Sequence, residues 1–302
     1  MVEKMSDRAS GLFGGLATFM RKCLFKVISV GPVPDHIAFI MDGNRRFAKK
    51  KNNPTGAGHK AGYSSLMSML AHCYELGVKY VTVYAFSIDN FKRPPEEVQF
   101  LMDLMLEKIE GLLEKESIVI EYGIRVYFIG NLELLCEPVR LAAQRAMKAT
   151  AKNTKFFLLV CVAYTSCDEI VHAVQESCKH KRNEIQANGE IHGGVDDDKK
   201  TNGVVLRDVE EAEVSEKKDK LPSIKLVDIE KHLCMAVAPD PDIVIRSSGE
   251  TRLSNFLLWQ TSHCPLYSPS ALWPELGLRH LVWAVLNFQR SYRYLEKKRK
   301  KI

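Results

Sequence analysis

Five consecutive positions near the start of the chain carry a carboxylate, a glycine, an amide and two guanidinium groups. They are Asp42, Gly43, Asn44, Arg45 and Arg46, and an aromatic residue, Phe47, follows them. A carboxylate can hold a hard cation such as Mg²⁺, and guanidinium groups donate paired hydrogen bonds to phosphate oxygens. The cluster therefore predicts a site for a metal-bound diphosphate. The alternative is an Asp-Gly turn followed by exposed arginines.

Two further segments carry similar groups, each directly after an apolar run. The run 79–86 is followed by Ser87, Asn90, Phe91 and Arg93. The run 242–246 ends in Arg246, and the turn after it contributes Ser247, Ser248, Arg252 and Ser254. Because the carboxyl ends of parallel strands meet at one edge of a sheet, all three segments are expected to form one site. Because three strand ends carry the same kinds of side chain, a phosphate site is a better explanation than a chance distribution of polar residues.

A histidine stands in the segment Gly58-His59-Lys60-Ala61-Gly62, which opens the first long predicted helix. Free backbone N–H groups and the helix dipole favour an anion at such a position. His59 is expected to contact a diphosphate or to steady the metal site. The alternative is that it only caps the helix.

Short apolar runs alternate along the chain with segments of helical periodicity. Strands are predicted at 36–41, 79–86, 125–129, 156–163 and 242–246, and helices at about 58–76, from 94 onward, and at 137–151, 167–178 and about 275–297. Nearly all-apolar strands that alternate with helices are typical of a parallel sheet covered by helices on both faces. The predicted fold class is α/β.

Two segments fall outside this alternation. Residues 12–28 have apolar side chains at helical spacing with basic residues between them, which predicts an amphipathic helix within residues 1–30. It either packs on its own domain or lies at a membrane interface. Residues 179–222 are rich in charge and poor in apolar side chains, which predicts a flexible surface insertion. We expect residues 31–302 to form a single catalytic domain that contains this insertion.

Composition narrows the class of protein. The chain has 302 residues, 46% of them hydrophobic, and a formal charge of +6, which indicates a globular protein with anionic partners. Its eight cysteines include no C-x-x-C pair, which favours a reducing compartment without a zinc site. Neither a signal peptide nor an apolar run of about 20 residues is recognisable, so the catalytic body is expected in the cytosol.

Motifs of several other protein classes are missing from the sequence. It has no nucleotide-binding G-x-x-x-x-G-K-[ST] loop, no G-x-G-x-x-G after the first strand, and neither H-E-x-x-H nor G-x-S-x-G. The basic residues form no patch interleaved with aromatic residues, so nucleic-acid binding is not expected.

The segment 36–46, HIAFIMDGNRR, resembles the signature of the cis-prenyltransferases, which include undecaprenyl and dehydrodolichyl diphosphate synthases. The resemblance spans roughly residues 33–295 and is closest to plant catalytic subunits. Its other motifs are Gly58-His59, Phe86-Ser87 with Asn90 and Arg93, residues 246–260, and Leu272-Trp273-Pro274. It implies a parallel six-stranded sheet flanked by helices, with an apolar product tunnel.

The resemblance also implies an activity, the condensation of isopentenyl diphosphate onto an allylic diphosphate such as farnesyl diphosphate. The product would be a long-chain cis-polyprenyl diphosphate, a dolichol precursor. Rubber-type cis-polyisoprene synthesis and a non-catalytic subunit of such an enzyme are the alternatives. A trans-prenyltransferase is not expected, because the chain has no D-D-x-x-D motif.

Roles for individual residues follow from the same resemblance. Mg²⁺ is expected on Asp42, and the allylic diphosphate near Gly43, Asn44, Arg45, Arg46 and Phe47. Isopentenyl diphosphate is expected on Arg246, Arg252 and Ser254. Ser87, Asn90 and Arg93 would help shape the reacting centre, with Asn90 placed to assist proton removal. His59 is expected among the catalytic residues, and Phe91 and Arg93 among those that bind substrate. The tunnel walls, or an ordinary core, would come from Val98, Leu101, Met102, Met105, Ile109, Leu112 and Leu113.

Three departures from the bacterial pattern resemble eukaryotic catalytic subunits. Thr55 stands in place of a diphosphate-binding arginine, and Pro265 in place of a metal-associated glutamate. The C-terminal residues lack the R-x-G element of homodimeric members, which eukaryotic enzymes borrow from an accessory subunit related to the Nogo-B receptor. We therefore expect such a heteromer, in peripheral contact with the cytosolic face of the endoplasmic reticulum. The cytosol and a rubber particle are the alternatives.

Overall fold

The computed structural model describes residues 15, 18–114, 117–191 and 223–299. The described residues within 1–169 and 237–302 form one compact part, and those within 170–236 form another. The larger part contains the sheet and all three polar segments predicted from the sequence.

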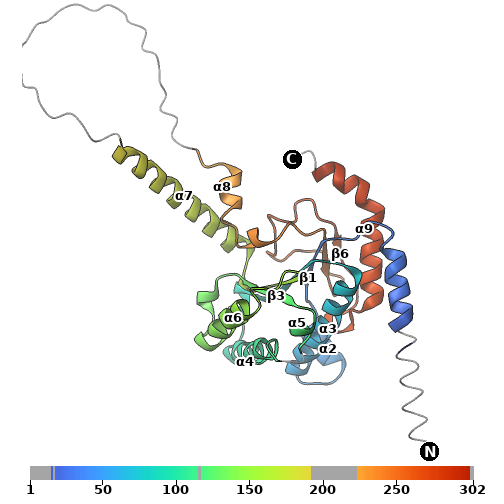
Figure 1. The fold of residues 1–302 in the computed structure, drawn as a ribbon. Coiled ribbons are helices and arrows are strands. Elements are labelled where there is room, and N and C mark those ends of the chain that lie inside the picture. The colour runs from blue at the N-terminus through green and yellow to red at the C-terminus, as the bar shows by residue number, and fades with distance from the viewer. Residues whose placement is uncertain (1–14, 16–17, 115–116, 192–222, 300–302) are drawn as a thin grey trace, which may run out of the picture. The chain divides into compact units, whose positions relative to one another are not determined.

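A sheet of six parallel strands forms the centre of the larger part (Figure 1). The strands are β1 (His36–Ile40), β2 (Tyr80–Ser87), β3 (Ile124–Ile129), β4 (Phe156–Tyr164), β5 (Ile243–Arg246) and β6 (Leu266–Tyr267). Their order across the sheet is β3-β4-β2-β1-β5-β6. The chain builds the sheet on one side of β1 and later continues it on the other side with β5. Open α/β sheets bind ligands beside such a reversal, beyond the carboxyl ends of the strands.

The strands β1 and β5 are buried along their whole length. Every side chain of β1 and of β5 is buried, as expected for parallel strands covered on both faces. The core continues through β2 and β4 into the helices that cover the sheet. The loops after β1 and β5 therefore start from fixed positions.

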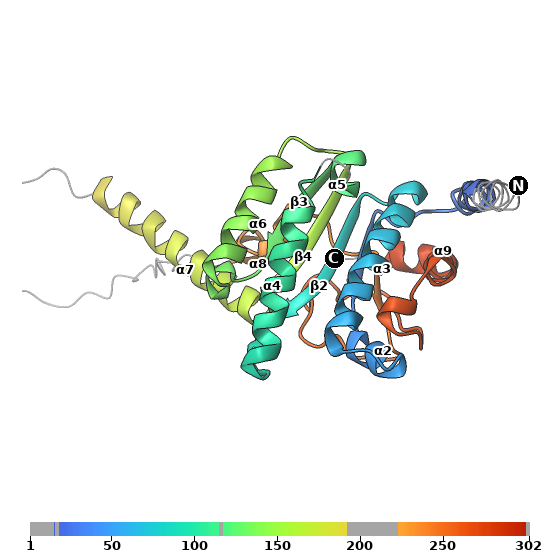
Figure 2. The same ribbon diagram turned by 90° about the horizontal axis from the view of Figure 1, so that it is seen from below.

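The helices of the larger part follow the predicted alternation. They are α2 (Asn44–Lys50), α3 (Thr55–Leu76), α4 (Pro95–Gly111), α5 (Ile118–Glu121), α6 (Glu137–Ala149) and α9 (Leu278–Arg299), with 3₁₀ turns at Ile88–Lys92, Leu132–Leu134 and Trp273–Glu275. α4 begins with a proline and two glutamates in its first turn, which suit a helix N-terminus. α2 packs on α3, and α4 packs on α6 (Figure 2).

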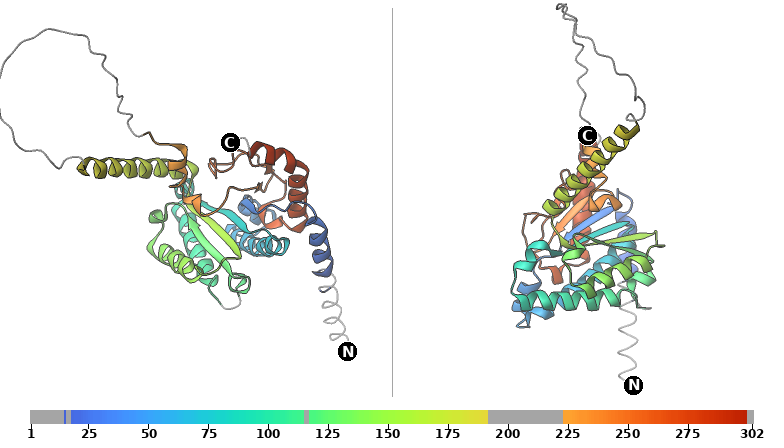
Figure 3. Two further views of the ribbon diagram at one scale, coloured as in Figure 1. Left: turned by 45° about the horizontal axis from the view of Figure 1, so that its top comes forward. Right: turned by 90° about the vertical axis from the view of Figure 1, so that its left-hand side faces the viewer.

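Residues 18–28 form a helix that lies beside α9 (Figure 3). Phe25 and Ile28 are buried, whereas the side chains of Phe19 and Val27 are 62% and 71% exposed. Arg21 pairs with Glu75 of α3 at 2.8 Å. The helix thus packs on its own domain through one face and leaves apolar side chains exposed elsewhere; residues 1–14 and 16–17 lie outside the described residues. No helix in the described ranges is long and apolar enough to cross a bilayer.

The smaller part contains most of α7 (Ser166–Ile191), together with α8 (Leu226–Glu230) and most of a 3₁₀ turn at Cys234–Val237. The buried Ser177 hydroxyl donates to the carbonyl oxygen of Asp228 at 2.9 Å and so joins α7 to α8. α7 continues past the predicted end at 178, so residues 179–191 of the predicted insertion are helical. Ion pairs such as Lys181–Glu184, at 2.9 Å, stabilise this extension. The rest of the predicted insertion, 192–222, lies outside the described residues.

Candidate active site

The carboxyl ends of β2, β1 and β5 are neighbours in the sheet and carry the three predicted polar segments. A polar cavity of about 330 Å³ lies at these strand ends. The predicted residues that line it are Asp42, Asn44, His59, Ser87, Asn90, Arg93, Arg246 and Ser254. The fold therefore brings together residues that are up to about 200 positions apart in the sequence.

Asp42 is a half-buried carboxylate in the lining of this cavity. Its Oδ1 accepts a hydrogen bond from Arg46 Nη2 at 3.0 Å, and its Oδ2 accepts one from Arg246 Nη2 at 2.9 Å. Burial alone would raise the pKa of Asp42, but the hydrogen bonds from Arg246 and Arg46 outweigh burial and hold this pKa below its ordinary value. The carboxylate is therefore ionised at neutral pH.

The loop after β1 is fastened to the loop after β5. The hydroxyl groups of Ser247 and Ser248 donate to the carbonyl oxygen of Asp42 at 2.7 and 2.9 Å. Gly43 has a φ of 106°, and a Cβ there would lie 2.5 Å from Ser248 Oγ. A side chain at position 43 would both strain the backbone and push the two loops apart.

Two glycines bring α3 against the start of α2. A Cβ at Gly58 would overlap the backbone oxygen of Asn44, and a Cβ at Gly62 would overlap its Oδ1. This close approach places His59 at the cavity. Its Nε2 is buried and has no hydrogen-bond partner among the described residues. Burial, followed by the charge of Arg93, lowers the pKa of His59, so the ring is neutral at pH 7.

The 3₁₀ turn after β2 fixes Ser87 and Asn90. Ser87 Oγ accepts a hydrogen bond from the backbone N–H of Asp89 at 3.2 Å, and Asn90 Oδ1 accepts one from the backbone N–H of Ser87 at 3.1 Å. This reciprocal cap holds both side chains at the cavity wall. The oxygen of the Asn90 amide is therefore already engaged.

Two glutamates hold arginines around the rim of the cavity. Arg93 Nη1 donates to Glu97 Oε1 at 2.9 Å, and Arg45 Nη1 lies 3.6 Å from the same oxygen. Arg46 Nη1 lies 3.9 Å from Glu250 Oε1. Arg45 and Arg46 are exposed and available to a ligand that approaches from solvent.

Arg246 and Arg252, which were predicted to act together, differ in their surroundings. Arg246 is 4% exposed, and its Nη1 donates to Ser254 Oγ at 2.7 Å and to the backbone oxygen of Arg252. The Arg252 side chain is 63% exposed and pairs with Glu250. Only the backbone of Arg252 therefore reaches Arg246, while its guanidinium group lies outside the cavity lining.

Of the two predicted aromatic residues, only Phe91 supports the cavity. Its ring packs edge to face on Phe86, with centroids 4.9 Å apart, and Phe86 lines the polar cavity. Phe47 is half-buried in α2 and is not part of the cavity lining.

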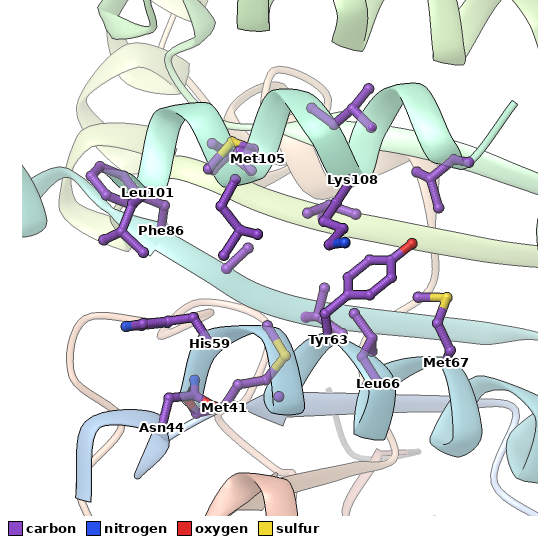
Figure 4. Close-up of a pocket in the computed structure, with 18 of the residues that line it drawn as sticks. Met41, Asn44, His59, Tyr63, Leu66, Met67, Phe86, Leu101, Met105 and Lys108 are labelled. Atoms are coloured by element: carbon purple, nitrogen blue, oxygen red, sulfur yellow. The ribbon is translucent and has the colours of Figure 1, made fainter. Parts of the chain in front are cut away.

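A second, apolar cavity of about 160 Å³ lies between α3 and α4 (Figure 4). It shares Met41, Asn44, His59, Ala85, Phe86 and Leu101 with the polar cavity, so the two adjoin. Of the predicted wall residues, Leu101, Met105, Ile109 and Leu112 line it. Val98, Met102 and Leu113 pack in or against the core instead.

Sequence reasoning missed Tyr84, Glu97 and Glu250. Tyr84 lines the polar cavity, and its hydroxyl donates to the backbone oxygen of Tyr164 at 3.1 Å. The spacing of Glu97, four positions after Arg93, could have indicated its ion pair. The role of Tyr84 had no comparable signal, because a tyrosine within a strand is ordinary.

Comparisons with known proteins agree with this geometry. A family profile described as putative undecaprenyl diphosphate synthase matches residues 40–296. Dehydrodolichyl diphosphate synthase 6 of Arabidopsis thaliana is 59% identical over 301 residues, which are 100% of this chain and 98% of that protein. A rubber cis-polyprenyltransferase of Hevea brasiliensis is 54% identical over 98% of each chain.

Two further relatives extend the comparison. A human protein named as a dehydrodolichyl diphosphate synthase complex subunit is 41% identical over 95% of this chain and 76% of its own length. The crystal structure of lavandulyl diphosphate synthase from Lavandula x intermedia, in complex with dimethylallyl diphosphate, has a TM-score of 0.64 and 27% identity. That match covers 85% of this chain and 95% of the lavender enzyme.

The chain belongs to the cis-prenyltransferase family, since the family profile covers most of its length. Within that family its relatives include plant and animal dehydrodolichyl diphosphate synthases and a rubber synthase. The predicted family, the predicted six-stranded parallel α/β fold and the predicted class of enzyme, a prenyl-transferring one, are confirmed.

Proposed function

We propose that this enzyme condenses isopentenyl diphosphate repeatedly onto an allylic diphosphate such as farnesyl diphosphate, giving a long-chain cis-polyprenyl diphosphate. The observation that carries the proposal is that the polar cavity around Asp42 adjoins the apolar cavity between α3 and α4. A diphosphate suits the first cavity and a hydrocarbon chain the second. The names of the dehydrodolichyl diphosphate synthases support a dolichol precursor as the product.

The two substrates would occupy different sides of the polar cavity. The allylic diphosphate would bind near Gly43, Arg45 and Arg46, with the neutral His59 as a hydrogen-bond partner and its chain between α3 and α4. Isopentenyl diphosphate would bind Arg246 and Ser254, with Arg252 reaching in from the rim. Fixed hydrogen-bond donors of this kind orient the two diphosphates and so align the reacting carbons. They stabilise the charge of the departing diphosphate better than mobile water does.

The reaction forms one carbon–carbon bond and breaks one carbon–oxygen bond. The terminal double bond of isopentenyl diphosphate attacks the allylic carbon, and the bond from that carbon to its diphosphate breaks. A proton then leaves the isopentenyl unit, and a new cis double bond forms. Because an amide is a poor base and Asn90 Oδ1 is engaged, Asn90 would orient the reacting groups while a diphosphate oxygen takes the proton.

Magnesium fits this site as an ion that arrives with its substrate. The described residues contain no cluster of three or more histidine, cysteine or acidic ligands that could hold a metal by themselves. Asp42 offers a single carboxylate, and Mg²⁺ is commonly held by one or two carboxylates together with substrate phosphates. When bound, the ion would neutralise charge on the departing diphosphate.

We further propose an accessory subunit related to the Nogo-B receptor and peripheral contact with the endoplasmic reticulum membrane. The human relative is named as a complex subunit, and the Arg252 side chain, which is 63% exposed, is accessible to a partner. The apolar side chains of Phe19, Met20 and Val27, exposed on the N-terminal helix, suit a membrane interface.

The proposal is tested by incubating the protein, alone and with the candidate subunit, with radiolabelled isopentenyl diphosphate and farnesyl diphosphate. We expect long cis-polyprenyl products when Mg²⁺ is present and none when it is chelated. Absence of any polyprenyl product in all of these mixtures would refute the proposed activity.

A further inference from the structure

The loop after β5 has a strained backbone where it passes the polar cavity. Ser254, Asn255 and Leu257 have φ values of 49°, 59° and 47°, in the left-handed region that residues other than glycine rarely adopt. Such a backbone persists only where surrounding contacts hold it, and it is found most often at functional sites. Asparagine tolerates this conformation better than most residues do, whereas serine and leucine need the support of their neighbours.

Three hydrogen bonds join this loop to the start of α7, whose residues up to Glu169 belong to the larger part of the chain. The backbone N–H of Ser166 donates to the carbonyl oxygen of Asn255 at 2.8 Å, and that of Cys167 donates to Asn255 Oδ1 at 3.0 Å. In return, Ser166 Oγ accepts from the backbone N–H of Leu258 at 2.8 Å. The first N–H groups of a helix have no partner within the helix, so Asn255 caps α7 from a distant segment.

The same loop also packs against the wall of the polar cavity. Phe256 is fully buried, and its ring stacks on that of Tyr84 with centroids 4.6 Å apart. The Tyr84 hydroxyl lies 3.5 Å from the carbonyl oxygen of Ser254. Between these contacts, Ser254 Oγ is held 2.7 Å from Arg246 Nη1. The strained backbone thus sets the position of Ser254 relative to Arg246.

We propose that Asn255 is a positioning residue for isopentenyl diphosphate, which it serves by holding Ser254 beside Arg246. The inference rests on the proposed function and adds to it a residue that is not part of the cavity lining. Without its side-chain bond to α7, the loop relaxes toward ordinary backbone angles and Ser254 Oγ moves away from Arg246. The allylic diphosphate, proposed to bind at Arg45 and Arg46, is not affected.

The test measures KM for each substrate, with the candidate subunit present, in variants of this contact. Asn255→Gly keeps the left-handed backbone but removes the side-chain bond to α7, and Ser166→Ala removes the acceptor for the N–H of Leu258. Both are expected to raise KM for isopentenyl diphosphate on the order of 10-fold, about the effect of one lost hydrogen bond, and to leave KM for the allylic primer unchanged. Asn255→Asp keeps an oxygen that accepts from the helix and should retain the wild-type KM values.

The matched control is Asn52→Gly. Asn52 is exposed between α2 and α3 and also has a left-handed backbone, with a φ of 53°. The same substitution there should leave both KM values unchanged. Urea unfolding of each variant checks that folded proteins are compared.

Three results would overturn the positioning role. They are an unchanged KM for isopentenyl diphosphate in both Asn255→Gly and Ser166→Ala, an equal rise in KM for the two substrates, and a rise in Asn255→Asp as large as in Asn255→Gly. A wild-type protein that makes no polyprenyl product would instead refute the proposed function. The two failures are therefore distinguishable.

Discussion

At the scale of single residues, the site depends on how Asp42 is held. Arg46 and Arg246 each donate to one of its oxygens, at 3.0 and 2.9 Å, and the pKa of the carboxyl group is lowered despite burial. A diphosphate would compete for these arginines and leave the carboxylate to its counter-ion. Binding of the substrate would thus exchange the arginine partners of Asp42 for a metal ion.

Replacement of Asp42 by alanine is expected to lower kcat by at least about 10²-fold, in line with the loss of one preorganised electrostatic group. The fold should survive, because the backbone of residue 42 is held by Ser247 and Ser248. Asp103→Ala, on the exposed side of α4, is the control and should retain full activity. If Asp42→Ala had near-wild-type turnover and a circular-dichroism spectrum that matched the wild type, Asp42 would not be the residue that holds the metal.

The two arginines after β5 should differ in effect when each is changed to alanine. Arg246 is buried and contacts both Asp42 and Ser254, so its loss should reduce kcat/KM for isopentenyl diphosphate on the order of 10²-fold. The exposed Arg252 should matter less, roughly 10-fold or below, since solvent screens its charge. Saturation kinetics with each substrate separates the two effects. An equal loss for both variants would contradict the geometry.

At the scale of elements, those helices and strands that have a clear local pattern of apolar and polar residues could be predicted from the sequence. The buried strands and the clusters at their carboxyl ends are recognisable because apolar runs and polar turns alternate. β6 has two residues and α2 has seven, which is too short for a periodicity signal. The loop that carries Arg252 has a left-handed backbone at Ser248 and Ser254, and the contact between Arg46 and Glu250 depends on how two distant loops meet. Neither can be inferred from spacing along the chain.

The approach of α3 to α2 is expected to tolerate no side chain at position 62. Gly62→Ala places a Cβ against Asn44 and Trp273 and should destabilise the fold by about 1–3 kcal/mol. Gly111→Ala, at the end of α4, meets nothing within 4 Å and should stabilise it by about 0.4–1 kcal/mol. Urea unfolding measures both. If the two variants had equal free energies of unfolding, α3 could shift away from Asn44 and accommodate a Cβ at position 62.

A buried histidine in β1 makes stability depend on pH. His36 Nδ1 donates to the carbonyl oxygen of Pro239 at 2.6 Å, and Nε2 accepts from Thr82 Oγ1 at 2.7 Å. Burial lowers the pKa of His36 to about 4. Between this value and the ordinary pKa of 6.5 only the unfolded chain binds the proton. The free energy of unfolding should therefore fall by up to about 3 kcal/mol between pH 7 and pH 4.

Urea unfolding followed as a function of pH checks this expectation, and Asp42 provides the comparison. The lowered pKa of Asp42 removes stability only at more acidic pH, as that carboxylate becomes protonated. A stability profile that stays flat from pH 7 to pH 5 would show that His36 can take up a proton within the folded protein.

At the scale of the whole molecule, two exposed features fit the proposed accessory subunit and membrane contact. They are the Arg252 side chain and the apolar side chains of the N-terminal helix. Each lies in the larger part of the chain, Arg252 in the loop after β5 and the apolar side chains on the helix of residues 18–28. A subunit that covers Arg252 would exclude water from the isopentenyl diphosphate side of the cavity. A membrane beside residues 18–28 would bring the long apolar product close to lipid.

Addition of the accessory subunit is therefore expected to lower KM for isopentenyl diphosphate, with a smaller effect on KM for the allylic primer. Initial rates measured with and without the subunit, with each substrate varied in turn, provide the test. Arg252→Ala should lose most of this gain, whereas Lys148→Met, on the exposed surface of α6, should keep it. If the subunit lowered only the KM for the allylic primer, the interface would not lie beside Arg252.

The most direct test of the account is a crystal structure of the protein with a non-hydrolysable thio-analogue of farnesyl diphosphate and Mg²⁺. We expect the diphosphate at Arg45 and Arg46, the ion on Asp42, and the farnesyl chain between α3 and α4 beside His59 and Tyr63. A diphosphate bound only to Arg246 and Arg252, or a farnesyl chain outside the apolar cavity, would contradict it.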